Sequence, residues 1–189
     1  MMTFAEELLE LAQDIASLNA AKPRQARIRR AVSTAYYALF HLLISEATLN
    51  WTRKELRPQL GRLFDHGPMS TASINKAAEL SAYFKEDPPE GPERTIAEHL
   101  RVVATTFDEA QQRRVDADYN LAKEITETEM LTQIEDVTQA FKSWDIIRDD
   151  LSAQQYLLSL LGAKERRQPR KPGSRKRQRN RRQQPPAAT

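Results

Sequence analysis

The sequence contains no cysteine. This absence excludes disulfide bonds, thiolate nucleophiles and cysteine-ligated zinc or iron–sulfur centres, and it is compatible with a reducing compartment. The first residues, Met-Met-Thr-Phe-Ala-Glu-Glu, also lack the basic region and the long apolar core of a signal peptide. We therefore expect a cytoplasmic protein.

Glycine is scarce, with five residues in 189, and no stretch alternates apolar and polar residues over the length of a strand. Apolar residues instead recur at spacings of three and four, which is typical of amphipathic helices. No apolar run reaches the roughly 20 residues that a membrane-spanning helix needs. The sequence therefore predicts an all-α protein, an antiparallel helical bundle of about five helices, and no membrane association.

Charge is missing from residues 31–45, although 29% of the whole chain is charged. Eleven of these fifteen residues are apolar or aromatic, which is enough to cover the whole circumference of a helix. Pro23 suits the first turn of such a helix, because that turn has no N–H partner to lose. We therefore expect a buried central helix over residues 23–49, whose few polar side chains need internal partners or a site.

Four arginines lie in the first two turns of this central helix: Arg24, Arg27, Arg29 and Arg30. The helix dipole already makes that end positive, so the arginines are mildly unfavourable there unless an anion or an acidic neighbour compensates them. Two interpretations remain open, a solvated basic end and a contact with phosphate.

The other expected helices are residues 3–19, part of 51–64, 70–84, a stretch from 93 to the 113–120 region, and one from 126 onward. Residues 65–68 are expected to form a turn and residues 85–92 an exposed connection, because both are rich in proline and glycine. Two helix starts carry the pattern of a capping box, in Thr3 with Glu6 and in Thr126 with Glu129.

Two apolar faces follow from the spacing of three and four. The first helix is expected to bury Phe4, Leu8, Leu11, Ile15 and Leu18. The last helix is expected to pack along another helix through Met130, Ile134, Val137, Phe141, Trp144 and Leu151.

The net charge of +3 conceals two parts of opposite sign. Residues 162–189 contain eleven Lys and Arg and one acidic residue, a local charge of +10, and the remaining 161 residues carry −7. Apart from alanine the segment after Leu161 has no apolar residue, so it cannot bury enough surface to fold. We therefore divide the chain into a helical bundle, residues 1–161, and a disordered basic C-terminal tail, residues 162–189.

The basic tail has no aromatic side chain on which bases can stack. Any binding of RNA or DNA by the tail is therefore expected to act through phosphates, without sequence preference and with a strong dependence on salt. A solvated tail without a partner is the alternative. A membrane surface is a poorer partner, because the tail has no apolar face to insert.

Sequence motifs for enzymatic chemistry are few. The three histidines, His41, His66 and His99, have no metal-binding spacing, and the chain contains no phosphate-binding loop, dinucleotide-binding turn or serine nucleophile elbow. No metal or cofactor is therefore expected. The densest polar cluster is Arg113-Arg114-Val-Asp-Ala-Asp-Tyr119, whose members need a turn or a helix end to converge. In the alternative interpretation, the aspartates neutralise the arginines and Tyr119 closes the end of the bundle.

Three segments together resemble the HEPN superfamily (higher eukaryotes and prokaryotes nucleotide-binding). They are Arg30-x6-Tyr37-x3-His41 within Ala-Tyr-Tyr-Ala-Leu-Phe-His, then Asp65-His66-Gly, and Arg114-Val-Asp-Ala-Asp-Tyr119. The resemblance spans roughly residues 20–150. It implies an all-α bundle that commonly dimerises. It also implies either a metal-independent ribonuclease with an Arg-x4–6-His motif or the partner of a minimal nucleotidyltransferase in a toxin–antitoxin pair.

The chain departs from the ribonuclease motif, because the positions that follow Arg114 after four, five or six intervening residues hold Tyr119, Asn120 and Leu121. A phenol with a pKa of about 10 is a poor general acid–base near neutral pH, where imidazole is effective. We therefore expect a HEPN-like protein of a bacterial toxin–antitoxin or defence setting that binds RNA, a nucleotide or a nucleotidyltransferase. The alternatives are a metal-independent ribonuclease and an adaptor that binds nucleic acid through its tail. The candidate catalytic residues are Arg114, Tyr119 and His41, and the candidate binding residues are Arg30, Tyr37, Arg113, Asp118 and His66.

Overall fold

A computed structural model describes residues 2–18, 24–86 and 90–162. These ranges contain seven α-helices, one short 3-10 helix and no strand. The elements are α1 (Phe4–Ser17), α2 (Arg24–Leu49), η1 (Lys54–Leu56), α3 (Arg57–Gly61), α4 (His66–Glu86), α5 (Gly91–Tyr119), α6 (Glu127–Ile147) and α7 (Leu151–Leu160). The prediction of an all-α bundle is confirmed: α1, α2, α4, α5 and α6 are the five long helices, and α3 and α7 are short additions. The tail from residue 163 onward, which was expected to be disordered, lies outside the described residues.

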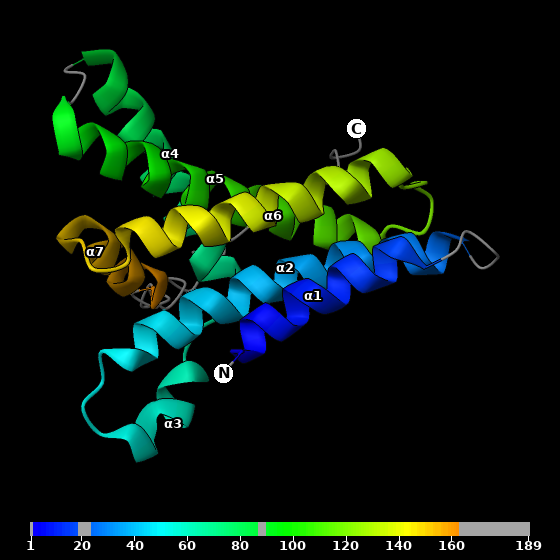
Figure 1. Ribbon diagram of the computed structural model, residues 1–189, viewed down its shortest axis with the longest axis horizontal. Helices are drawn as coiled ribbons and strands as arrows, with labels where there is room; N and C mark the ends of the chain where they lie inside the picture. The colour runs from blue at the N-terminus through cyan, green and yellow to red at the C-terminus, as the bar shows by residue number, and fades with distance from the viewer. Residues whose placement is uncertain (1, 19–23, 87–89, 163–189) are drawn as a thin grey trace, which may run out of the picture.

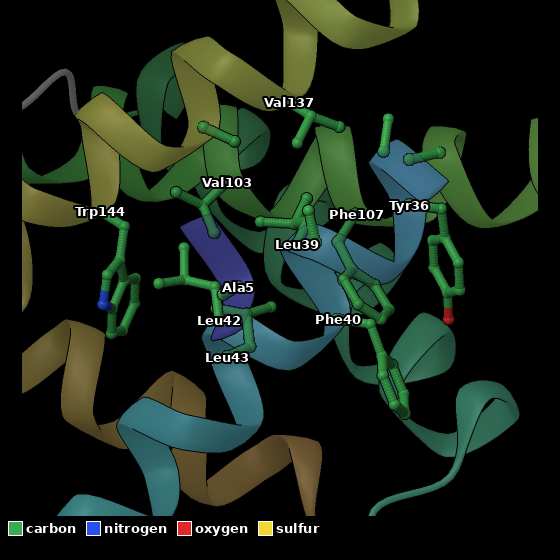
Figure 2. Packing of buried hydrophobic residues seen from close by; sticks show 14 of the residues in the cluster. Ala5, Tyr36, Leu39, Phe40, Leu42, Leu43, Val103, Phe107, Val137 and Trp144 are labelled. Carbon is green, nitrogen blue, oxygen red and sulfur yellow. The ribbon is translucent and has the colours of Figure 1, made fainter. Parts of the chain in front are cut away.

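The central helix α2 packs against α1, α5 and α6 (Figure 1). Every residue from Ala31 to Leu43 is buried except Tyr37 and His41, which are half-buried. Figure 2 shows side chains of α2, among them Leu39 and Leu43, meeting Val103 and Phe107 of α5 and Val137 of α6. The prediction of a buried central helix is therefore confirmed. Within the described ranges, no helix is both long enough and apolar enough to cross a membrane.

Both predicted capping boxes are present. The Glu6 carboxylate accepts from the Thr3 backbone N–H at 2.5 Å, and the Thr3 hydroxyl accepts from the Glu6 N–H at 3.3 Å. The second box, at Thr126 and Glu129, has matching distances of 2.7 and 3.1 Å. In each box, two side chains accept hydrogen bonds from two backbone N–H groups that would otherwise lack partners at the start of the helix. Each box therefore fixes where its helix begins.

The predicted buried face of α1 is partly wrong, although Leu8 and Ile15 are partly buried against the core as expected. The structure buries Ala5, Leu9 and Ala12, whereas the side chains of Phe4 and Leu11 are 59% and 48% exposed. Small alanine side chains allow the backbones of α1 and α2 to approach closely, and this close packing rotates the larger apolar residues toward the outside.

The predicted seam of the last helix is also partly wrong. Met130, Ile134, Val137 and Trp144 are buried, but α6 ends at Ile147 and Leu151 is 71% exposed. The Asp150 carboxylate accepts from the Ser152 N–H at 2.7 Å and caps a new helix, α7, so the seam cannot continue.

Two predicted connections are shorter than expected. Three of the four residues of the expected turn at 65–68 belong to the first turn of α4, which begins at His66. Pro68 is tolerated there because a first-turn residue has no helical N–H bond to lose. The expected connection at 85–92 begins inside α4, which continues to Glu86, and ends inside α5, which begins at Gly91.

Candidate functional site

Arg114 is held between the last turns of α5 and the middle of α2. Its Nη2 donates to the Tyr37 hydroxyl at 2.6 Å, and its Nε lies 2.8 Å from Oδ2 of Asp118. Its side chain is only 12% exposed. A guanidinium that is fixed from two sides in this way has few conformations left, so its remaining nitrogen points in a defined direction.

Three aromatic rings surround this guanidinium. Its central carbon lies 5.3 Å from the ring centres of both Tyr37 and Tyr119 and 6.0 Å from that of Tyr36. Such distances are typical of cation–π contacts. Tyr119 is the last residue of α5, and the end of the helix brings its ring over Arg114 as the sequence required. Tyr119 does not close the end of the bundle, because it is 69% exposed.

The charge of Arg114 is stable in this setting. Burial acts to lower the pKa of Arg114, but the hydrogen bond to Tyr37 and the nearby Asp118 and Tyr119 outweigh burial and raise it. Arg114 is therefore a permanent cation at any physiological pH.

Asp118 connects Arg114 to α2. Its Oδ1 accepts a short hydrogen bond from the hydroxyl of the buried Ser33, while its Oδ2 faces Arg114. Arg113, the neighbour in sequence, points elsewhere: its guanidinium binds Asp136 of α6 at 2.8 Å and Glu109 at 3.1 Å. The structure thus separates the two arginines that the sequence placed in one cluster.

His66, the first residue of α4, joins the same aromatic group. Its Nδ1 lies 2.5 Å from the Tyr36 hydroxyl, and its ring centre lies 4.3 Å from that of Phe40 and 6.0 Å from that of Tyr37. Burial lowers the pKa of His66, the positive charge of Arg114 lowers it further, and Asp65 partly opposes both. His66 is therefore mainly neutral at pH 7. Burial also raises the pKa of Tyr36, which keeps that phenol protonated.

His41 lies beside this group and not within it. Its ring packs against Phe4 at 5.0 Å and Phe40 at 5.4 Å, and it lines a separate hollow with Arg57 between α1, α2 and α3. Burial lowers the pKa of His41, with a smaller contribution from His66. Arg30 is exposed near the start of α2, and its side chain forms no hydrogen bond or ion pair within the described residues.

The sequence analysis missed the role of Arg29. Its Nη1 donates to the carbonyl oxygens of Asp116 and Ala117 at 3.1 and 2.9 Å, and its Nη2 donates to those of Asn120, at 3.1 Å, and Lys123. These carbonyls belong to the end of α5 and the loop after it, where helical partners are missing. Arg29 therefore fixes the segment that carries Asp118 and Tyr119.

Two other arginines of the basic cluster find an acidic neighbour. Arg27 pairs with Glu127 at 2.7 Å and Arg24 with the same carboxylate at 3.4 Å. With the clamp formed by Arg29, these pairs compensate most of the positive charge at the start of α2. Phosphate is therefore not needed there to explain the cluster.

Of the candidate residues, the structure brings together Arg114, Tyr37, Tyr119, Asp118 and His66. It leaves His41 at the margin and places Arg30 and Arg113 outside. In the described ranges, no three His, Asp or Glu side chains lie close enough together to hold a metal ion. Comparison with protein-family models, with curated proteins and with solved structures found no match.

Proposed function

We propose that this chain is a HEPN-like protein of a bacterial toxin–antitoxin or defence setting, and that its Arg114 site binds a phosphate group of RNA or of a nucleotide. The observation that carries the proposal is the guanidinium of Arg114, fixed by Tyr37 and Asp118 beneath the exposed ring of Tyr119. Arginine binds phosphate oxygens through several N–H groups in one plane, and an exposed aromatic ring offers a surface for a base.

The remaining donor of the guanidinium supports this proposal. Within the described residues, Nη1 of Arg114 forms no hydrogen bond, and it is not among the fully buried atoms that lack a partner, so it retains some access to solvent. Asp118 offsets one positive charge at the site. The affinity for phosphate is therefore expected to be moderate and to fall as salt rises.

The test is the binding of a short, fluorescently labelled single-stranded RNA to the full chain, measured by fluorescence anisotropy. We expect Arg114→Lys to weaken binding severalfold, because lysine keeps the charge and loses the planar fork. Tyr119→Ala should weaken it by about tenfold if a base stacks on the ring. Arg113→Lys is the matched control, since it makes the same change one residue away on a side that faces α6.

The basic tail is the same in all these variants, so any difference between them reports on the Arg114 site alone. If Arg114→Lys and Tyr119→Ala, both folded by circular dichroism, bind as tightly as Arg113→Lys, then the site does not bind RNA. The adaptor alternative, in which the tail alone binds nucleic acid, would then remain.

A ribonuclease is the second candidate, and the position of His66 favours it. No histidine follows Arg114 at the spacing of the ribonuclease motif. The His66 imidazole nevertheless packs against Tyr36 and Tyr37, whose rings also contact Arg114. In this version Arg114 stabilises negative charge on the phosphorus-centred transition state, and neutral His66 accepts the proton of the attacking 2′-hydroxyl. The 2′-oxygen forms a bond to phosphorus as the bond from phosphorus to the 5′-oxygen breaks, and the leaving 5′-oxygen takes a proton from water.

Cleavage of RNA in excess chelator tests this second candidate, with His66→Gln and His41→Gln compared. The lowered pKa of His66 implies a rate that is constant above pH 6.5 and falls only at lower pH, where the base becomes protonated. Loss of cleavage in His66→Gln alone would support the ribonuclease, whereas equal rates in both variants would refute this role.

Protein partners belong to the proposal through the HEPN resemblance, which implies a homodimer or a complex with a minimal nucleotidyltransferase. Phe4 and Leu11 of α1 and Leu18, directly after its last residue, are exposed apolar side chains spaced seven residues apart. They favour a protein contact. Sedimentation of the wild type and of Leu11→Gln at micromolar concentration tests this. A monomeric wild type would refute the proposed homodimer.

A further inference from the structure

Two adjoining hollows form one groove along α4, on the side that faces α7. Their volumes are about 650 and 520 Å³, and both are lined by Lys76, Glu79 and Gln155. One end of the groove lies at Pro68 in the first turn of α4, and the other reaches Glu93 in the first turn of α5. We call it the α4–α7 groove.

The described chain ends inside the mouth of this groove. Gly162 lines the groove beside Pro68 and has a φ of +55°, which residues with a side chain rarely adopt. A Cβ at Gly162 would lie 2.7 Å from Cβ of Pro68, and the Gly162 N–H donates to the Ser159 carbonyl at 3.1 Å. The chain therefore leaves α7 through a tight turn against α4, and the basic tail starts at the groove.

The far end of the groove is acidic. Lys76 and Glu79 neutralise each other through an ion pair of 2.8 Å, but Glu93 and Asp150, which also line the groove, form no ion pair within the described residues. The first charged residues after Gly162 are Lys164, Glu165, Arg166 and Arg167, and they sum to a positive charge. The far end of the groove and the segment after Gly162 therefore carry charges of opposite sign.

The length of chain that is needed also fits. Helix α7 has 10 residues, so it spans about 15 Å. An extended chain covers about 3.3 Å per residue, so roughly five residues reach from Gly162 back along α7. An extended segment running back along α7 would therefore have Arg166 and Arg167 near Asp150 at the start of that helix.

We propose that the α4–α7 groove binds the chain's own basic segment, residues 163–171, with Arg166 and Arg167 against Glu93 and Asp150. This docking does not depend on the Arg114 site. It holds the first positive charges of the tail on the acidic bundle, so nucleic acid must compete with the groove for that part of the tail.

The absence of cysteine makes a cross-linking experiment direct, because two introduced cysteines are then the only thiols in the chain. The full chain with Gln155→Cys and Glu165→Cys places one thiol in the middle of the groove and one on the tail. The chain with Gln139→Cys and Glu165→Cys is the control, because Gln139 is exposed on α6 and does not line the groove. We expect the groove pair to form an intramolecular disulfide at least tenfold faster under mild oxidation.

Charge variants separate docking from simple proximity along the chain. Glu93→Gln with Asp150→Asn should slow cross-linking of the groove pair severalfold, and asparagine keeps the cap of α7. Glu135→Gln, on an exposed position of α6, should leave the rate unchanged. Equal rates for the groove pair and the control pair, or no effect of the charge variants, would overturn the proposal. A covalent dimer as the main product would assign the groove to the tail of a second copy and would also overturn it.

Discussion

Removing the guanidinium of Arg29 should destabilise the protein far more than its half-exposed position suggests. Arg29 donates four hydrogen bonds to the carbonyls of Asp116, Ala117, Asn120 and Lys123, which gather the end of α5 and the following loop around one cation. The change Arg29→Met keeps most of the apolar stem and removes only the charged donors. The effect of the variant therefore measures the clamp.

The expected loss follows from these contacts. A hydrogen bond from a charged donor contributes about 1.5–3 kcal/mol when it is buried. Here the acceptors lie at a helix end near the surface and regain water, so each bond is discounted to about 0.5–1 kcal/mol. Loss of the favourable interaction between a cation and a helix C-terminus adds about 0.5 kcal/mol. Arg29→Met should therefore lower the free energy of unfolding by about 2.5–4.5 kcal/mol.

Urea unfolding followed by circular dichroism measures this change, with linear extrapolation to water. The matched control is Arg30→Met, since Arg30 is exposed and its side chain forms no hydrogen bond or ion pair within the described residues. A surface substitution of that kind changes the free energy of unfolding by no more than about 0.5 kcal/mol. Arg29→Lys should recover less than half of the loss, because an ammonium cannot reach four carbonyls at once. An unfolding free energy for Arg29→Met within 0.5 kcal/mol of the control would refute the clamp.

Three further predictions concern stability. Burial lowers the pKa of both His41 and His66, so the folded state favours their neutral forms. The free energy of unfolding should therefore fall as pH drops from about 6.5 to 5.5. The double variant His41→Gln with His66→Gln should flatten that pH dependence in urea titrations. Thr126→Ala should cost about 1 kcal/mol in the same assay, because the start of α6 loses its cap; a change below 0.3 kcal/mol would contradict the capping role. Gly162→Ala should lower the melting temperature by several degrees, since the new methyl group meets Pro68 in a backbone conformation that alanine avoids; an unchanged value would show that the turn can relax.

Local features of the sequence determined a large part of the fold. The capping boxes at Thr3 and Thr126 each involve groups three residues apart, so their geometry needs no distant partner. The charge-free stretch of residues 31–45 likewise requires burial from all sides, whatever surrounds it. These features therefore gave the helical class, two helix starts and the central position of α2.

The spacing of three and four in α1 identified an amphipathic helix but located its buried side only in part. Alanine counts little in a pattern of large apolar residues, yet Ala5 and Ala12 form the contact face because they let two backbones come close. Which face packs is decided by the shape of the partner helix, and that information is spread over the whole chain. The same holds for Leu151, whose exposure depends on a cap at Asp150 that competes with a continuous helix.

The candidate site shows the same division. The sequence singled out Arg114, Asp118 and Tyr119 because they lie within six residues, and a helix end was the one condition for their convergence. It gave no sign that His66, 48 positions earlier, would lie in the same aromatic group, or that Arg29 would clamp the end of α5. Contacts between residues this far apart arise only when α2, α4 and α5 pack together, so only the tertiary structure decided them.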